Sequence, residues 1–392
     1  MNYRKDLYGN DLSVLGFGCM RFAKKGAKTD MLEVERELLT AIRAGINYFD
    51  TAYVYPGSEA ALGEILAKHN LRERVYIATK LPHYLIKKSS DLDRIFNEQL
   101  ARLKTDYIDY YLIHMLSDIA SWERLRGLGI EEWIEKKKKS GKIRQIGFSF
   151  HGSANAFREV LDAYSWEFCQ IQYNYLDENS QAGRRGLHYA AKKGLPVIIM
   201  EPLRGGRLAD KLPKKAKKIF EKHEPKRSPA EWAFHWLWDQ PEVTCVLSGM
   251  NSMEMLRENI RAACRARAGG LNDAGRAMFA DVVAAINAKM KVPCTGCGYC
   301  MPCPADVDIP GAFAAYNRRY TDSRFWGFID YTICTALRQN GTGASGCKKC
   351  GKCEPHCPQG IAIREELTKV QKTMEGPVYR IVRGTIKKFK LF

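Results

Sequence analysis

The sequence of 392 residues predicts an α/β protein in which a (β/α)8 barrel is followed by a small cysteine-rich domain. Three observations support this prediction. Eight short apolar runs alternate with amphipathic, helix-like stretches over about the first 285 residues. Polar residues of chemical interest stand at the carboxyl ends of those runs, where barrels of this kind build their sites. Beyond residue 286 the composition changes to Cys, Gly and Pro.

The apolar runs give eight candidate strands, each with room for a helix before the next. They are continuously apolar, as expected of parallel strands covered on both faces. In chain order they are residues 13–19, 46–51, 75–80, 107–114, 143–150, 168–174, 197–202 and 243–249. Segments 31–45 and 58–70 are amphipathic, and the Gly-Asn turn in YRKDLYGNDL (3–12) predicts a hairpin ahead of the barrel. A doubly wound sheet is the alternative fold, but the sequence lacks its Gly-rich fingerprint.

Four of the polar residues form a constellation that suits proton transfer to a carbonyl group. Tyr55 alone would be a poor acid near neutrality, because the pKa of an unperturbed phenol is about 10. A buried Lys80 beside it would favour the phenolate, and Asp50 paired to Lys80 would fix its charge and position. His114 could orient a carbonyl oxygen or relay a proton. Asp50, Tyr55, Lys80 and His114 are therefore the candidate catalytic residues.

The segments that contain these residues resemble the aldo/keto reductases. GINYFDTAYVYPGSEAALGEIL (45–66) is similar to that family's G-x-N-x-F-D-T-A-x-x-Y…S-E segment, while VYIATKLP (75–82) supplies the Lys and IDYYLIH (108–114) the His. The resemblance covers about residues 1–265. It implies a (β/α)8 barrel, a small carbonyl substrate, NADPH or NADH as cofactor, and Tyr55 as the general acid.

The resemblance also implies a set of cofactor contacts. Met20 and Arg21 fall near the expected nicotinamide, and Ser149 and Gln170 fall where the family binds the carboxamide. Met200 replaces an aromatic residue that usually stacks under the ring, although a thioether can also lie against a ring. The residue after Ser149, usually Asn, is Phe150. The remaining implied contacts, to the pyrophosphate, the adenine and the rim of the last strand, are Pro202, Leu203, Gly205, Gly206, Ser248, Gly249, Glu258 and Asn259.

The region expected to bind a 2′-phosphate departs from the pattern of NADPH-preferring relatives. SGMNSMEMLREN (248–259) contains Arg257 as its one basic residue, outside the usual phosphate-contacting positions. A phosphate monoester needs a cationic partner, so NADH is at least as plausible as NADPH. Arg21 could hold a substrate carboxylate or pair with an acid at the barrel rim.

Eight of the thirteen cysteines fall into two short runs, a spacing that binds metal more readily than it forms disulfides. The second run, Cys-x2-Cys-x2-Cys-x3-Cys-Pro, resembles bacterial two-cluster ferredoxins. That resemblance implies two 4Fe–4S clusters with crossed ligands. One set is Cys347, Cys350, Cys353 and Cys303, and the other is Cys294, Cys297, Cys300 and Cys357.

The first run departs from that pattern, because two residues rather than three separate Cys300 from Cys303. Cys334 is an alternative ligand for this reason. Two zinc sites are the competing interpretation, but the close spacing followed by Pro is poor for zinc. Cys169 and Cys245 lie in candidate strands and are expected to pack as small apolar groups, whereas Cys19 lies near the expected cofactor.

The charge distribution favours an acidic partner. The formal net charge is +18, and residues 286–392 hold 17 Lys and Arg against 8 Asp and Glu, an excess of 9 positive charges. Two clusters would offset part of it, since four thiolates give each a charge of roughly −2. The sequence shows no nucleic-acid motif and no apolar run long enough to span a membrane, and it does not begin like a signal peptide. We expect a cytoplasmic protein whose acidic electron partner resembles a ferredoxin.

The sequence thus predicts three parts: an aldo/keto reductase-like barrel (1–285), a ferredoxin-like two-cluster domain (286–375) and a basic C-terminal tail (376–392). The leading interpretation is an oxidoreductase that reduces an aldehyde or ketone with NAD(P)H and is connected to electron transfer by its clusters. The alternatives are an electron-transfer module or a redox sensor whose barrel no longer performs carbonyl chemistry. A flavin would convert hydride into single electrons, but no flavin motif is found in the sequence.

Overall fold

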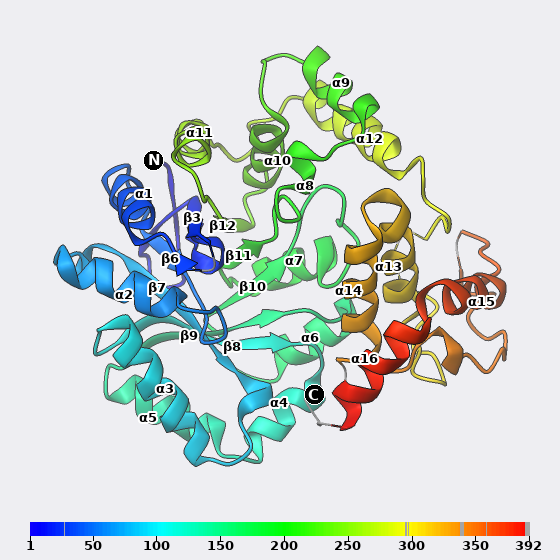
Figure 1. The fold of residues 1–392 in the computed structure, drawn as a ribbon, viewed down its shortest axis with the longest axis horizontal. Helices are drawn as coiled ribbons and strands as arrows, with labels where there is room; N and C mark the ends of the chain where they lie inside the picture. Colours follow the sequence, from blue (N-terminus) through cyan, green and yellow to red (C-terminus); the bar gives the residue numbers. More distant parts are fainter. Residues whose placement is uncertain (27, 295, 297, 338–340, 358, 389–392) are drawn as a thin grey trace.

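The first part of the chain forms a closed barrel of eight parallel strands, as predicted (Figure 1). The computed structural model describes all residues except 27, 295, 297, 338–340, 358 and 389–392. Strands that are neighbours in the barrel are neighbours in the sequence. They are β3 (Leu15–Gly18), β6 (Tyr48–Asp50), β7 (Tyr76–Pro82), β8 (Ile108–Leu116), β9 (Ile143–Phe150), β10 (Phe168–Gln172), β11 (Val197–Met200) and β12 (Val243–Ser248).

The strands are apolar on both faces because each face meets a different part of the core. One set of side chains, with Tyr48, Tyr110 and Phe168, fills the interior of the barrel. The alternate set, with Phe49 and Tyr111, packs outward against the surrounding helices. Those helices are α1 (Met31–Arg43), α2 (Ser58–Lys68), α3 (Ser90–Leu103), α4 (Ile119–Arg126), α5 (Ile130–Lys139), α6 (Ala154–Asp162), α7 (Gly183–Lys192), α10 (Pro229–Trp238) and α11 (Met253–Cys264). Helices α8 (Arg207–Asp210), α9 (Lys214–Lys222) and α12 (Asp273–Asn287) form a separate apolar cluster with α10.

The predicted N-terminal hairpin packs against one end of the barrel. Its strands β1 (Tyr3–Lys5) and β2 (Asp11–Ser13) pair antiparallel. Leu12 is fully buried in the same cluster as the interior tyrosines. Asp6 accepts a hydrogen bond of 2.6 Å from the hydroxyl of Tyr110. Since the hairpin occupies the amino ends of the strands, the site must be built at their carboxyl ends.

The C-terminal part has its own hydrophobic core, which includes Phe313, Tyr331, Leu367 and Tyr379. It is formed by α13 (Ile309–Thr321), α14 (Arg324–Thr335), α15 (Ile363–Met374) and α16 (Pro377–Lys388), with the cysteine runs in the connecting loops. The predicted basic tail is thus largely helix α16, whose Tyr379 is buried and shares a 2.6 Å hydrogen bond with Thr335. In the part of the chain that the structure describes, no helix combines the length and hydrophobicity needed to cross a membrane.

Helices α13 and α14 lie beside the open end of the barrel (Figure 1). Arg207 of α8 forms an ion pair with Asp322, which follows α13. Asp322 also pairs with Arg318 at 3.3 Å, and Arg318 reaches Asp330 of α14 at 2.5 Å. These groups are partly or largely buried, so the ion pairs are less screened than surface pairs. They fix the cysteine-rich part against the barrel rim.

The α2–α3 contact depends on the absence of a side chain at Gly63. A Cβ atom at this position would lie 2.5 Å from the backbone of Arg102 and Leu103. We therefore expect Gly63→Ala to destabilise the barrel by about 1–3 kcal/mol, despite the better helix propensity of Ala. Urea unfolding followed by circular dichroism measures this change. Gly384→Ala in α16 is the matched control, because no atom lies within 4 Å of its Cβ position; equal effects of the two changes would contradict the packing argument.

Candidate active site and cluster ligands

A buried ion pair lies at the carboxyl ends of the adjacent strands β6 and β7. The Lys80 Nζ atom is 2.6 Å from Asp50 Oδ1 and donates a second bond of 2.7 Å to the carbonyl of Thr51. Lys80 is 1% exposed and Asp50 5%. Burial by itself would lower the pKa of Lys80, but Asp50 and Tyr55 outweigh it, and the pKa is raised above its ordinary value. The ammonium is therefore permanently charged and fixed in place.

The structure brings the other two predicted catalytic residues to this pair. Tyr55 follows β6, and its ring centroid lies 5.2 Å from Lys80 Nζ. The His114 ring, on β8, meets the Tyr55 ring edge to face with a centroid separation of 6.1 Å. Asp50, Tyr55, Lys80 and His114 thus form one cluster at the open end of the barrel.

The protonation states of Tyr55 and His114 follow from their surroundings. Burial raises the pKa of Tyr55 above 10, with Lys80 opposing this rise and Asp50 adding to it. Burial lowers the pKa of His114 well below 6.5, and the Lys80 charge acts in the same direction. Near neutral pH the site therefore contains a protonated phenol and a neutral imidazole.

The residues expected at the nicotinamide lie next to this cluster. Gln170 Nε2 donates to Asp50 Oδ2 at 2.8 Å, and Ser149 Oγ accepts from the backbone N–H of Met115 at 2.9 Å. Among the described residues, Gln170 Oε1 and His114 Nδ1 are buried without a hydrogen-bond partner. Phe150 points the other way and packs edge to face on Phe157. Its replacement of the usual Asn is therefore accounted for by core packing.

The remaining expected cofactor residues line the rim around β3, β11 and β12. Arg21 donates to the carbonyl of Gly205 at 3.1 Å, and its side chain lies over Gly205 and Gly249. This partner is a backbone carbonyl, neither of the two partners expected for Arg21. Met20 is 61% exposed, whereas Met200 packs against the barrel interior. The other rim residues, in the turn after β11, are Pro202, Leu203 and Gly206.

The residues expected at the adenine have protein partners. Asn259 donates to Ser248 Oγ at 3.1 Å, and Glu258 accepts a hydrogen bond from Ser228 at the start of α10. Arg257 is exposed on α11. These bonds order the start of α11 beside the carboxyl end of β12.

Seven of the eight cysteines of the two runs lie in the described part of the chain, and Cys297 lies outside it. Cys294, Cys300 and Cys357 line one small cavity together with Ile309 and Phe313. Burial raises the pKa of Cys353, and the nearby thiols of Cys347 and Cys303 add to this rise. Cys350 is exposed. Cys294, Cys300 and Cys357 thus form one group, and Cys303, Cys347 and Cys353 form a second.

The donor chemistry of these groups fits iron–sulfur clusters. Each group offers soft thiol ligands in short loops, with apolar side chains behind them. Among the described residues, no three His, Cys, Asp or Glu side chains converge as they would around a single metal ion. Cys334, the alternative ligand, is buried and its thiol donates to the carbonyl of Tyr331. Cys169 and Cys245 are buried, and burial raises their pKa values, as expected of apolar packing groups. Cys19, for which this was not predicted, is also buried, and burial raises its pKa.

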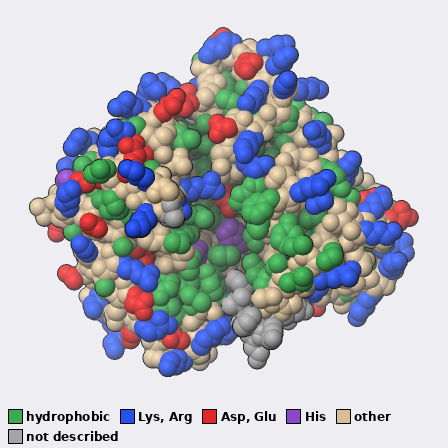
Figure 2. Space-filling view, in the orientation of Figure 1, with side chains coloured by type: hydrophobic (Ala, Val, Ile, Leu, Met, Phe, Trp, Pro, Cys, Tyr) green, Lys and Arg blue, Asp and Glu red, His purple; other side chains and the backbone are tan. Residues whose placement is uncertain are grey.

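Two further histidines near the site were not singled out from the sequence. His83 follows β7 and His151 follows β9, and both lie close enough to His114 to affect its pKa. Burial lowers the pKa of each to about 4. Histidine side chains are visible at the bottom of the hollow in Figure 2. Their positions at strand ends are the signal that could have identified them, since the same rule selected Lys80 and His114.

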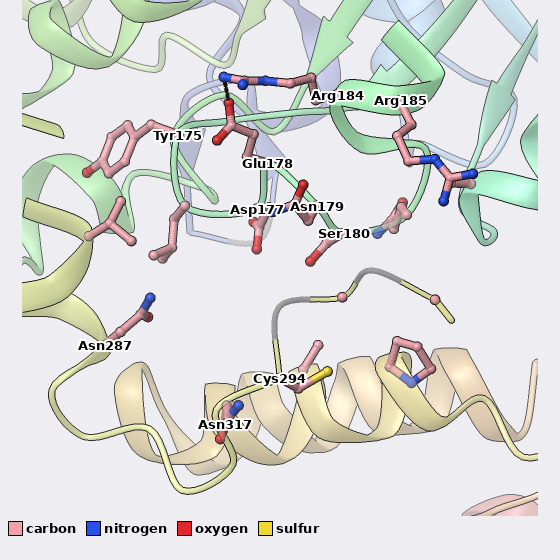
Figure 3. Close-up of a pocket in the computed structure, with 18 of the residues that line it drawn as sticks. Tyr175, Asp177, Glu178, Asn179, Ser180, Arg184, Arg185, Asn287, Cys294 and Asn317 are labelled. Carbon is pink, nitrogen blue, oxygen red and sulfur yellow. Dashed lines mark ion pairs between the residues drawn. The ribbon is translucent and has the colours of Figure 1, made fainter. Parts of the chain in front are cut away.

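A cavity of about 910 Å³ lies between the barrel and the cysteine-rich part (Figure 3). Its barrel wall is the loop after β10, from which Asp177 and Ser180 face the opening. Its other wall is α13 and the loop that carries Cys294. Arg204 forms an ion pair with Asp177, and Arg184 with Glu178. One expected cluster ligand therefore adjoins a solvent-accessible cavity at the interface.

Comparison with known proteins agrees with this architecture. Residues 14–266 match the aldo/keto reductase family, and residues 293–362 match the 4Fe-4S dicluster domain. "Uncharacterized oxidoreductase YqkF" of Bacillus subtilis is 27% identical over 289 residues, which cover 64% of this chain and 88% of the relative.

Two solved structures share the fold of the barrel. The holo form of aldo-keto reductase AKR11C1 from Bacillus halodurans superimposes with a TM-score of 0.60 at 24% identity, covering 72% of this chain and 96% of that chain. An aldo-keto reductase from Klebsiella pneumoniae in complex with NADPH gives a TM-score of 0.57 at 22% identity, covering 71% and 93%. The chain is thus an oxidoreductase that belongs to the aldo/keto reductase family and carries a 4Fe–4S dicluster domain after its (β/α)8 barrel.

Proposed function

We propose that the protein reduces a small aldehyde or ketone with a nicotinamide cofactor, and that Asp50, Tyr55, Lys80 and His114 carry out the proton chemistry. The observation that supports this most directly is the buried Lys80–Asp50 pair, 2.6 Å apart, beside the ring of Tyr55. Burying an ammonium is costly, and here the ion pair with Asp50 offsets that cost. The charge of the ammonium stabilises a phenolate that forms on the neighbouring Tyr55.

In this mechanism Tyr55 donates its hydroxyl proton to the carbonyl oxygen of the substrate. The Lys80 ammonium stabilises the phenolate that remains, and Asp50 keeps the ammonium oriented. His114, neutral because burial lowers its pKa, directs a ring N–H at the carbonyl oxygen without adding a charge. A bound nicotinamide supplies the hydride that the carbonyl carbon receives. Solvent returns the proton to Tyr55 after the alcohol leaves.

The residues around the cluster suit such a cofactor. Gln170 Oε1 is a buried acceptor without a partner among the described residues, and a carboxamide N–H would satisfy it. Ser149, Met200 and the rim formed by Gly205 and Gly249 are the further contacts that we propose. The Klebsiella pneumoniae relative is described as a complex with NADPH. In this chain Arg257 is the one basic residue of segment 248–259, and it is exposed. Because a 2′-phosphate needs a cationic partner, our proposal includes NADH as well as NADPH.

We further propose that the dicluster domain holds two 4Fe–4S clusters with the crossed ligand sets given above. The cavity lined by Cys294, Cys300 and Cys357 supports the set that contains these three residues. The other set is supported by the effect of Cys347 and Cys303 on the pKa of Cys353, which requires the three thiols to lie near one another. Bound clusters supply one-electron transfer. Cys350 is exposed between the exposed Lys348, Lys349 and Lys352, a surface that suits an acidic, ferredoxin-like partner in a reducing cytoplasm.

The alternative, an electron-transfer module or sensor without carbonyl chemistry, is motivated by Phe150, Met200 and the departure in the 2′-phosphate region. Phe150 packs into the core behind β9, which accounts for an aromatic ring at this position. This leaves carbonyl reduction as the function that the geometry supports best. For the proposed carbonyl reduction and the proposed cluster binding alike, we assign the barrel to residues 1–285, the cluster domain to 286–375 and the basic tail to 376–392.

Removing the Tyr55 hydroxyl tests the proton donor. We expect Tyr55→Phe to lower kcat for aldehyde reduction by at least about 10²-fold, since general acid catalysis of this kind contributes about 10²–10⁴-fold. Steady-state kinetics with NADH and NADPH measures it. Tyr53→Phe is the matched control, because the Tyr53 hydroxyl bonds to Glu98 outside the site. Equal activity of Tyr55→Phe and the unmodified protein would exclude Tyr55 as the acid.

The pH dependence tests the electrostatics. Because burial raises the pKa of Tyr55 above 10, the acid form persists over the working range, and kcat/KM for reduction should be flat between about pH 6 and 9. Oxidation of the alcohol needs the phenolate, so its rate should rise with pH throughout. Lys80→Met removes the charge that lowers the pKa of Tyr55, and should shift this rise to still higher pH. An inflection in reduction near pH 6.5 would indicate that His114 is protonated there, against its lowered pKa.

Iron analysis tests the cluster ligands. After anaerobic purification we expect about eight iron atoms per chain, and Cys350→Ser should lower this to about four while retaining the other cluster. Cys334→Ser is the control, since this thiol bonds to a backbone carbonyl in the α14 core. Loss of iron in Cys334→Ser but not in Cys350→Ser would reassign the ligand.

A further inference from the structure

A second cavity, of about 500 Å³, opens at the mouth of the barrel, and we call it the mouth cavity. Most of its wall comes from the segments after β7, β8 and β9, with Tyr84, Met115 and His151 among its residues. The rest comes from the dicluster domain, which contributes Ile333 and Leu337. The family match ends at residue 266, so this part of the wall lies outside the barrel that the relatives share. The hollow in Figure 2 is flanked by apolar side chains.

The mouth cavity adjoins the proposed catalytic residues. Met115 directly follows His114 in the chain, and His151 and His83 both influence the pKa of His114. Tyr84, also on the wall, lies close enough to Tyr55 that Tyr55 adds to the burial-driven rise in the pKa of Tyr84. A carbonyl group between Tyr55 and His114 would therefore have its substituents directed toward this space.

The charged groups of the mouth cavity already have partners or face water. Arg124 donates to the backbone carbonyls of His83 and Ile86 at 2.6 and 2.8 Å. Asp118 caps α4 by accepting from Ser121 N at 2.8 Å. The buried imidazoles of His83 and His151 are neutral near pH 7, since burial lowers the pKa of each to about 4. Lys87 is exposed at the edge. No described guanidinium on this wall is free to bind a substrate carboxylate.

Apart from the hydroxyl groups of Tyr84, Ser117 and Ser121, the remaining surface is apolar, and the ion pairs described above hold its outer wall in place. Ile86, Met115 and Leu128 face the space from the barrel, opposite Ile333 and Leu337. Asp330, three residues before Ile333 on α14, pairs with Arg318, and the Arg207–Asp322 pair joins this unit to the barrel. The wall formed by the dicluster domain is therefore fixed relative to the catalytic residues.

We infer that the mouth cavity binds the apolar substituent of a neutral aldehyde or ketone, and that Ile333 and Leu337 make the dicluster domain part of the substrate site. This inference rests on the proposed carbonyl reduction and extends it to the class of substrate. A substrate with a bulky hydrocarbon group gains contacts that a small one lacks, because removing apolar surface from water is favourable. Substrate selection by the barrel then depends on the dicluster domain, whose cysteines are proposed to bind the iron–sulfur clusters.

The test compares 3-phenylpropanal with propanal, which differ by a phenyl group. Ile333→Trp fills the cavity. It should lower kcat/KM for 3-phenylpropanal relative to that for propanal by about tenfold or more, mainly by raising KM for 3-phenylpropanal. Propanal, which does not need this space, should keep its kcat. Val378→Trp is the matched control, since Val378 is 67% exposed on α16 of the same domain. If Ile333→Trp fails to fold by circular dichroism, Leu337→Ala replaces it and should weaken binding of the phenyl substrate with unchanged propanal turnover.

A binding measurement separates this inference from the proposed function. Calorimetric titration of the full chain with 3-phenylpropan-1-ol should show binding that Ile333→Trp abolishes and Val378→Trp retains. Binding of this pattern without turnover of either aldehyde would support the cavity and overturn the carbonyl reduction. Turnover with an unchanged substrate ratio and unchanged alcohol binding in Ile333→Trp would overturn the cavity assignment and leave the reduction intact.

Discussion

The buried ion pair between Lys80 and Asp50 is the interaction on which the site depends. An ammonium that is 1% exposed would be strongly destabilised without its partner, so Asp50, the Thr51 carbonyl and Gln170 together form a fixed polar network inside an otherwise apolar barrel. The pair places a full positive charge beside Tyr55 and lowers the cost of forming a phenolate there. Burial is the main cause of the lowered pKa of His114, and the charge of Lys80 lowers that pKa further.

The arrangement of the rest of the molecule follows from which end of the barrel is open. The N-terminal hairpin packs Leu12 and Asp6 against the interior tyrosines at the amino ends of the strands. The carboxyl ends, with the tetrad, remain accessible, and α13 and α14 lie beside them. In our proposal this domain affects the site, because Ile333 and Leu337 line the mouth cavity that would receive the substrate. The ion pairs around Arg318 give that surface a defined position.

This arrangement also bears on the mismatch between hydride and single-electron chemistry. A nicotinamide transfers two electrons together, whereas an iron–sulfur cluster transfers one. The 910 Å³ cavity beside Cys294 and the 500 Å³ mouth cavity are both walled by the two domains. In our proposal the single-electron chemistry adjoins the first of these cavities and the hydride chemistry adjoins the second.

The sequence alone was sufficient for the barrel, its hairpin and the four candidate catalytic residues. Continuous apolar runs identify parallel strands covered on both faces, and the strand ends select Asp50, Lys80 and His114 without knowledge of the fold's details. The cysteine spacing likewise identified the dicluster domain, because ligands close in sequence need little tertiary information. The role of Phe150 was not predicted from the sequence. Its side chain points outward from β9 and packs on Phe157 in the core, which only the structure shows.

Only the tertiary structure decided how distant segments meet. The partner of Arg21 is the carbonyl of Gly205, more than 180 positions away in the chain, and neither alternative considered from the sequence was a backbone group. The neutral histidines His83 and His151, and the wall supplied by Ile333 and Leu337, depend on burial and on domain docking. Local patterns record the period of a strand or the spacing of a ligand loop. Burial and long-range packing arise from the sum of many contacts between remote residues, and no short stretch of sequence contains that information.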